Sequence, residues 1–203
     1  MAESINNILR FYWVRHLPIN KEGIYIGKSD VPAEIPPFPA NSAMLIPQGA
    51  VWYSSPLLRS VQTANWLMET YSGKEEKLNI AAELSEQDFG KWEGKSYEEV
   101  WKNEEKLHDW LNMASVKPQG GESFSELCDR FDGWLEKQVK LYSNTDDMVI
   151  IAVVAHAGTI RAAIRNALEI SAEKALSFNI DYGSLTQIDY LAGSGVRVNC
   201  VNR

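Results

Sequence analysis

The sequence predicts an α/β fold, in which a mostly parallel sheet is flanked by helices in three layers, with a helical insertion near residues 83–134. Two observations predict it. Apolar, strand-like segments alternate with helical segments, and the middle of the chain holds helix starts but no convincing strand. A length of 203 residues suits a single domain, expected to span residues 1–203.

Three segments have the composition of buried strands. Residues 8–14 are aromatic and β-branched, residues 50–54 are short, and residues 148–155 are continuously apolar. A continuously apolar strand is typical of a parallel sheet that is covered on both faces.

Helix signals follow the second and third of these strands. Ser55 and Pro56 predict an N-cap followed by proline at the first helical position, and an apolar stripe continues to Tyr71. After the third strand, Gly158 opens an Ala- and Ile-rich helical segment, residues 159–168.

Two capping boxes predict helices inside the insertion at 83–134. They are Ser96-x-x-Glu99 and Ser123-x-x-Glu126, in which the serine caps the helix and the glutamate bonds back to it.

The remaining segments carry turn and loop signals. Residues 185–190 and 196–201 flank the glycine-rich run 192–195, which predicts a hairpin. The proline-rich segment 31–47 predicts an extended surface loop.

Composition and charge narrow the classes of partner. Twenty Lys and Arg against 27 Asp and Glu give a net charge of −7, which repels a nucleic-acid backbone. A site for an anionic substrate must therefore be locally positive. Cys128 and Cys200 fit a reduced protein. The first residues lack signal-peptide character and no apolar run reaches the about 20 residues of a membrane span, so we expect a cytoplasmic protein without a membrane partner.

Histidines and arginines gather where the predicted strands end. His16 and His156 follow the two most apolar strands directly, Arg15 precedes His16, and Arg59 lies just after Ser55. The carboxyl ends of parallel strands line one crevice, so both imidazoles are expected to open onto one site. Arginine presents a fork of N–H donors that matches phosphate oxygens, which predicts a phosphate pocket.

Each of these residues also has a simpler interpretation on its own. A single histidine at a strand end is more often hydrogen-bonded there than functional, and a single arginine is usually solvated. His108, among charged residues on a polar helix, is interpreted as a bystander. The segments 23–29 and 90–96 resemble phosphate-binding P-loops but have three residues between their glycines where the pattern needs four, so they are not taken as nucleotide sites.

Four segments in chain order resemble motifs of the histidine phosphatase superfamily, also called phosphoglycerate-mutase-like. They are Val14-Arg15-His16, the run 54–64 with Ser54-Ser55-Pro56 and Arg59, the run 83–94 with Glu86 and Asp88-Phe89-Gly90, and the run 154–161 with His156.

This resemblance implies the roles of five residues. His16 is the expected nucleophile that takes the phosphoryl group, and Arg15, Arg59 and His156 are expected to hold the phosphate. Glu86 is the expected general acid that protonates the leaving oxygen. Phosphoryl transfer requires an in-line nucleophile and positive charge around the phosphate, so neither a cofactor nor a metal is expected.

The sequence departs from the family pattern after Arg-His. Leu17-Pro18-Ile19 stands where Gly, Glu and Ser or Thr are common, which leaves open how this loop contacts phosphate. This start, followed by the run 23–32, resembles the α-ribazole phosphatase branch, which acts late in cobalamin assembly. The expected function is therefore a phosphomonoesterase acting on a small phosphorylated metabolite such as α-ribazole 5′-phosphate.

Three alternatives remain. A phosphoglycerate-type mutase would need a strongly cationic pocket, whereas the insertion supplies few basic residues beyond Lys91, Lys95, Lys102 and Lys106. It instead holds Trp92, Trp101, Trp110 and Trp134. A metal-dependent hydrolase would use His16, His156, Asp88 and Glu86 as ligands, against the repulsion of two arginines. A catalytically inactive relative would only bind a phosphorylated ligand. The sequence predicts no oligomeric state.

Overall fold

The computed structural model describes residues 8–37, 46–71, 77–143, 145, 147–191 and 195–203. Its centre is one six-stranded sheet with the order β3-β2-β4-β1-β5-β6. The strands are β1 (Ile8–Arg15), β2 (Val51–Ser54), β3 (Leu78–Ile80), β4 (Val149–Ala155), β5 (Leu185–Leu191) and β6 (Gly195–Cys200).

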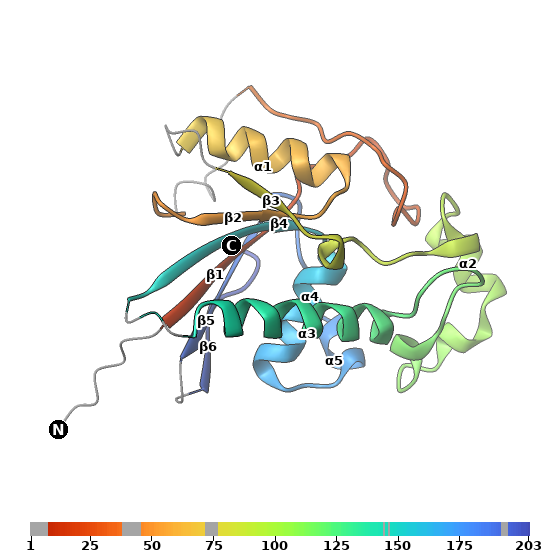
Figure 1. Cartoon of the computed structure of the whole chain (residues 1–203). Helices are drawn as coiled ribbons and strands as arrows, with labels where there is room; N and C mark the ends of the chain where they lie inside the picture. The colour runs from red at the N-terminus through yellow and green to blue at the C-terminus, as the bar shows by residue number, and fades with distance from the viewer. Residues whose placement is uncertain (1–7, 38–45, 72–76, 144, 146, 192–194) are drawn as a thin grey trace.

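Helices cover both faces of this sheet, so the expected three-layer α/β fold is confirmed. Helix α1 (Leu58–Tyr71) lies on one face, and α3 (Phe124–Leu141), α4 (Ala157–Leu168) and α5 (Ala172–Leu176) lie on the other (Figure 1). Alternate residues of β1 explain the layering. Phe11 and Trp13 pack with α3 and α4, whereas Tyr12 and Val14 pack with α1.

Strand direction follows the expected, mostly parallel pattern. Strands β1, β4, β2 and β3 pair in parallel, and β5 and β6 are antiparallel to their neighbours. The C-terminal hairpin is therefore present, although residues 192–194 of its predicted turn at 192–195 lie outside the described residues. Strand β3 was not predicted, because three half-exposed or exposed residues are too short to carry a periodic signal.

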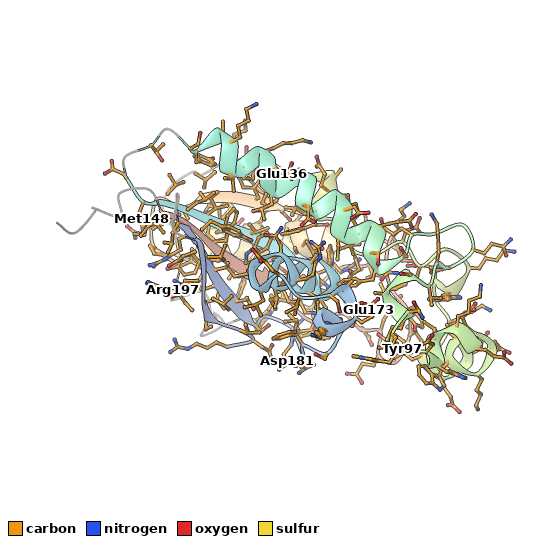
Figure 2. All side chains as sticks on the ribbon, turned by 90° about the horizontal axis from the view of Figure 1, so that it is seen from below. Tyr97, Glu136, Met148, Glu173, Asp181 and Arg197 are labelled. Carbon is orange, nitrogen blue, oxygen red and sulfur yellow. The ribbon has the colours of Figure 1, made fainter. Side chains whose placement is uncertain are left out.

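The insertion projects from one end of the sheet and contains no strand between residues 83 and 134, all of which are described. Figure 2 shows this end marked by Tyr97 and the opposite end of the molecule marked by Met148, with Glu136 on α3 between them. Beside α2 (Tyr97–Asn103), the insertion consists of short 3₁₀ turns at Ala82–Leu84, Gly90–Trp92, Glu105–His108 and Met113–Ser115.

Both predicted capping serines begin a helix. The Ser96 side chain accepts a hydrogen bond from the Glu99 amide at the start of α2. Ser123 and Glu126 form a complete capping box at the start of α3.

The start of α1 differs from the prediction. The helix begins at Leu58, and the carbonyl of Leu57 accepts from the amides of Ser60 and Val61, so Pro56 is not helical. A distant carboxylate supplies the cap, since Asp30 Oδ1 accepts from the Leu58 amide at 2.5 Å. The hydroxyl oxygen of Ser55 still accepts from the Leu57 amide at 3.3 Å, and it also lies 2.8 Å from His156 Nε2. Of the predicted loop at 31–47, residues 31–37 have no regular structure and 38–45 lie outside the described residues.

Candidate active site

The parallel pairing of β1 with β4 brings the two strand-end histidines together. Arg15 lies opposite Ala155 in the register, so His16 and His156 follow at the same edge of the sheet. Their ring centroids are 5.0 Å apart. Strand β2 pairs Ser54 with Val154 and so places Ser55 at the same edge.

Hydrogen bonds define the tautomer of His16. Its Nδ1 lies 2.8 Å from the carbonyl oxygen of Leu17, which can only accept, so Nδ1 carries the proton. Its Nε2 then holds a lone pair, which accepts a hydrogen bond from Arg59 Nε at 3.2 Å. The His16 side chain therefore presents Nε2 as its nucleophilic atom.

The surroundings of His16 keep a second proton off the ring, so the lone pair stays on Nε2. The residue is only 3% exposed. Burial, aided by the positive charge of Arg59, lowers the pKa of His16 to about 3. The imidazole is therefore neutral at physiological pH.

Arg59 is buried beneath His16, and each of its three guanidinium nitrogens donates a hydrogen bond. Besides the bond to His16, its Nη1 donates to the carbonyl of Ser29 at 2.8 Å and its Nη2 to that of Gly27 at 2.7 Å. Burial lowers the pKa of Arg59, and the charges of Glu86, Glu93 and Asp30 oppose that shift.

His156 is completely buried at the start of α4. Its Nε2 lies 2.8 Å from the hydroxyl of Ser55 and 3.3 Å from that of Ser60. Burial, aided by the positive charges of Arg59 and Arg15, lowers the pKa of His156 well below the ordinary histidine value.

Glu86 reaches the start of α4 from the insertion. Its Oε1 accepts from the Gln87 amide at 2.9 Å and its Oε2 from the Gly158 amide at 3.3 Å. A Cβ atom on Gly158 would collide with Oε1, so this position must be glycine for the carboxylate to fit. Arg130 fixes the preceding loop, since it donates to the carbonyls of Ser85 and Glu86 and pairs with Glu122.

Arg15 lies on the other side of His16. Its Nη1 donates to the carbonyl of Ile180 at 2.6 Å, and its guanidinium carbon lies 3.6 Å from the centre of the Tyr182 ring. Two buried nitrogens in this group lack a hydrogen-bond partner among the described residues, namely Arg15 Nε and His156 Nδ1.

Three of the five predicted residues open directly onto a cavity of about 400 Å³, while Arg59 and His156 lie beneath its floor. Its charged and polar wall includes Arg15, His16, Glu86, Lys21, Arg161 and Asn179. Its aromatic and aliphatic wall includes Tyr25, Phe89, Trp92, Leu107, Val116 and Tyr182.

Two further residues at the cavity, Arg161 and Tyr182, have no role predicted from the sequence. Arg161 Nε donates to the carbonyl of Phe178 at 2.9 Å, and no described residue accepts from its Nη atoms. Burial lowers the pKa of Arg161 despite the opposing charge of Glu86. The only available signal was its place one helical turn after Ala157, the first residue of α4, which also lines the cavity.

Other residues weighed from the sequence lie apart from this group. His108 packs on Trp101 and contacts its carbonyl, and both lie at the surface of the insertion. Asp88 pairs with Lys28 rather than with the histidines. Among the described residues, no three His, Cys, Asp or Glu side chains are grouped as metal ligands.

The departure at Leu17-Pro18 is compatible with this geometry. The Leu17 amide donates to Thr63 Oγ1 at 3.0 Å, and its carbonyl accepts from His16. Leu17 contributes only its backbone carbonyl to the contact with the His16 side chain, so this contact does not require the glycine that is common at this position.

The sequence profile of the histidine phosphatase superfamily (branch 1) matches residues 43–203, and the site residues from Arg59 onward lie within that match. The chain belongs to this superfamily. The expected family resemblance is thereby confirmed.

Curated relatives of this superfamily member carry the names of several phosphatases. Phosphoserine phosphatase 1 of Hydrogenobacter thermophilus is 33% identical over 140 residues, covering 68% of this chain and 63% of the relative. Adenosylcobalamin/alpha-ribazole phosphatase of Escherichia coli is 24% identical over 192 residues, covering 89% and 90%. The bifunctional protein of Mycobacterium tuberculosis is 29% identical over 153 residues, but the match spans only 40% of that protein's length.

Solved structures of low identity share the fold. The native structure of mycobacterial glucosyl-3-phosphoglycerate phosphatase superposes with a TM-score of 0.79 at 20% identity, covering 96% of this chain and 99% of that one. The putative alpha-ribazole-5′-P phosphatase of Escherichia coli gives a TM-score of 0.76 at 22% identity, with 96% of each chain covered. No described helix has both the length and the apolar character of a membrane span.

Proposed function

We propose that this protein is a phosphomonoesterase that works through a phosphohistidine on His16, without metal or cofactor. The observation that carries this proposal is the buried neutral imidazole, whose Nδ1 proton is held by the Leu17 carbonyl while its Nε2 faces a guanidinium. The phosphatase names of its relatives support the same class, phosphoric monoester hydrolase.

The first step transfers the phosphoryl group to the protein. Arg59 Nε gives up its hydrogen bond to His16 in favour of a phosphate oxygen, which frees Nε2 to attack phosphorus in line as the bond to the leaving oxygen breaks. Arg15 and Arg59 stabilise charge on the equatorial oxygens. Arg15 Nε and His156 Nδ1 are unpartnered and buried, so a phosphate oxygen would supply the acceptor that each lacks. Glu86 donates a proton to the leaving oxygen.

The second step returns the enzyme to its starting state. Glu86 accepts a proton from water as that water attacks phosphorus, and the N–P bond to His16 breaks to release inorganic phosphate. The neutral tautomer of His16 is regenerated with its Nδ1 proton unmoved.

The cavity supports hydrolysis rather than mutase chemistry. Lys91, Lys95, Lys102 and Lys106 do not line it, and Lys95 and Lys102 pair with Glu99 and Glu98 on α2. A mutase would need strong positive charge around two anionic groups, whereas much of this wall is aromatic or aliphatic.

We propose a bulky aromatic leaving group, such as that of α-ribazole 5′-phosphate. Trp92, Phe89 and Tyr25 line the cavity together and offer flat apolar surfaces. Of the other tryptophans of the insertion, Trp134 is in the core and Trp101 and Trp110 are exposed.

One observation favours a second substrate class. The Nη atoms of Arg161 have no acceptor among the described residues, and the side chain lines the cavity, so it suits a substrate with a carboxylate, such as phosphoserine.

A comparison of kcat/KM for α-ribazole 5′-phosphate, phosphoserine and 3-phosphoglycerate tests this function, with and without 2,3-bisphosphoglycerate. Phosphate release that is lost in His16→Ala supports the proposed hydrolase. Preference for phosphoserine that disappears in Arg161→Leu would select the carboxylate class instead. Efficient interconversion of 3- and 2-phosphoglycerate, or full activity of His16→Ala, would overturn the proposal.

A further inference from the structure

The two glycine-containing segments that resemble P-loops contact each other. Their backbones pair, with the Tyr25 amide donating to the Lys95 carbonyl at 2.9 Å and the Gly94 amide donating to the Tyr25 carbonyl at 2.8 Å. An isolated bridge joins Ile24 to Ser96. The loop 23–29 thus lies against the insertion.

A carboxylate of the protein occupies the amides that a P-loop would offer to phosphate. Glu93 Oε1 accepts from the amides of Gly27 at 3.0 Å and Ser29 at 2.9 Å, and its Oε2 lies 3.1 Å from the Gly27 amide. The approach is close, because a Cβ on Gly27 would lie 3.1 Å from Oε2 and would collide with the Gln87 carbonyl.

The same two residues hold Arg59 through their carbonyls. Arg59 Nη1 donates to Ser29 O and Nη2 to Gly27 O, at 2.8 and 2.7 Å. The third donor, Nε, points at Nε2 of His16. Glu93 on one side and Arg59 on the other therefore fix the loop, and the loop sets the orientation of the guanidinium.

We infer that Glu93 is a positioning residue for phosphate binding, which acts through the backbone of residues 27–29 to hold Arg59 against His16. This inference rests on the proposed function, since it assigns Glu93 to the phosphate-binding arginine of that site. Arg59 is buried, and an ion there needs both hydrogen-bond partners and a compensating charge. The charge of Glu93 also opposes the burial that lowers the pKa of Arg59.

The loop offers a matched control. Lys28 lies between the two residues that Glu93 holds, but its side chain points outward to Asp88 in a pair that is mostly exposed on the lysine side. Such pairs contribute little to stability. Lys28→Ala therefore changes the same loop without touching either Glu93 or Arg59.

The test measures binding of orthovanadate, an analogue of the transferring phosphoryl group. Glu93→Gln keeps the shape but loses the charge, and we expect its inhibition constant for vanadate to rise about ten- to a hundredfold, the value of one or two charge-assisted hydrogen bonds. We expect Lys28→Ala to stay within about twofold of wild type. Glu93→Asp restores the charge on a shorter side chain and should lie between Glu93→Gln and wild type.

A double-mutant cycle separates positioning from general support of the fold. In an Arg59→Lys background, which loses the paired Nη bonds, Glu93→Gln should produce little further change in the vanadate-induced rise in Tm. If Glu93→Gln does not give a folded protein, Glu93→Asp completes the same cycle. Unchanged vanadate affinity in Glu93→Gln would overturn the inference. So would a reduction of the vanadate-induced rise in Tm that is equally large in the wild-type and the Arg59→Lys backgrounds. Either result would leave the proposed function standing if wild-type turnover still requires His16.

Discussion

The Leu17 carbonyl decides which ring nitrogen of His16 carries the proton, and so which nitrogen is the proposed nucleophile. By accepting the Nδ1 proton at 2.8 Å, it leaves the lone pair of His16 on Nε2, where Arg59 faces it. Two backbone amides hold the carboxylate of Glu86, the proposed acid, at the wall of the same cavity. One neutral base and one carboxyl group are sufficient for the two proposed steps.

Replacement of Glu86 should affect substrates according to their leaving group. Glu86→Gln cannot donate a proton, so kcat for an alkyl phosphate should fall by about 10²- to 10⁴-fold. For p-nitrophenyl phosphate, whose leaving oxygen needs no proton, the fall in the phosphorylation step should be less than about tenfold. Single-turnover rates for both substrates check this prediction, and equal losses would remove Glu86 from the role of acid.

The buried histidines should make stability depend on pH. The pKa of His16 falls from 6.5 in the unfolded chain to about 3 in the native one, so the unfolded state binds the extra proton between these values. The folded state therefore keeps its full stability with respect to this histidine above pH 6.5, and the free energy of unfolding decreases as the pH falls from 6.5 toward 3. The free energy of unfolding of wild type, relative to His16→Asn, should drop by about 2 kcal/mol between pH 7 and 5. Urea titrations at both pH values measure it, and a constant difference would contradict a buried neutral His16.

At the scale of elements, the junction of strand and helix positions the chemistry. His16, Ser55 and His156 each follow the last residue of a parallel strand, so one sheet edge gathers them. The first turn of α4 then adds the Gly158 amide, which binds Glu86 from the insertion.

A methyl group on Gly158 should displace that carboxylate. The Cβ of Gly158→Ala would meet Glu86 Oε1 and lie 3.1 Å from Leu127 Cδ1, so we expect kcat to fall by about a hundredfold through misplacement of the acid. Gly133→Ala on α3 is the control, because nothing lies within 4 Å of its new Cβ and alanine favours the helix by about 0.5–1 kcal/mol. Wild-type kcat in Gly158→Ala would show that the contact with Glu86 is dispensable.

The sequence predicted the strand-end residues because their signals are local. An apolar run that ends in histidine is visible at His16 and at His156, and parallel pairing brings the two together. Glu86 was assigned only from family resemblance, since a glutamate in an acidic stretch is by itself more often a solvated charge.

The contacts that complete the site lie far apart in the sequence. Asp30 caps Leu58 across 28 residues, and Glu93 binds Gly27 across 66. No local pattern encodes such pairs, so the later start of α1 and the role of the loop 27–29 were not predicted. Arg161 escaped attention because an arginine on a helix is usually solvated.

At the scale of the whole molecule, a chain of net charge −7 concentrates cations at one cavity. Arg15, Lys21 and Arg161 line it and Arg59 lies beneath it, so a phosphate anion meets a locally positive site in a negative protein. The same charges repel a divalent cation from the two histidines.

Turnover should therefore be indifferent to chelators. Arg15 and Arg161 line the cavity and Arg59 contacts His16, so their positive charges disfavour a bound cation, and we expect kcat with p-nitrophenyl phosphate to stay within about twofold after prolonged dialysis against EDTA. Addition of Mg²⁺, Mn²⁺ or Zn²⁺ to the dialysed protein is the complementary measurement. Activity that is lost on dialysis and restored by one of these ions would favour a metal-dependent hydrolase.

The central claim is that the phosphoryl group passes through Nε2 of His16, and rapid-quench labelling tests it most directly. Wild-type protein mixed with a ³²P-labelled phosphomonoester and quenched within one turnover should carry label that is stable in alkali and labile in acid, mapped to the peptide that contains His16. Glu86→Gln should accumulate more of this species with an aryl phosphate, because it lacks the base that assists attack by water. Turnover by wild type with no acid-labile label on that peptide, or equal labelling of His16→Ala, would contradict the account.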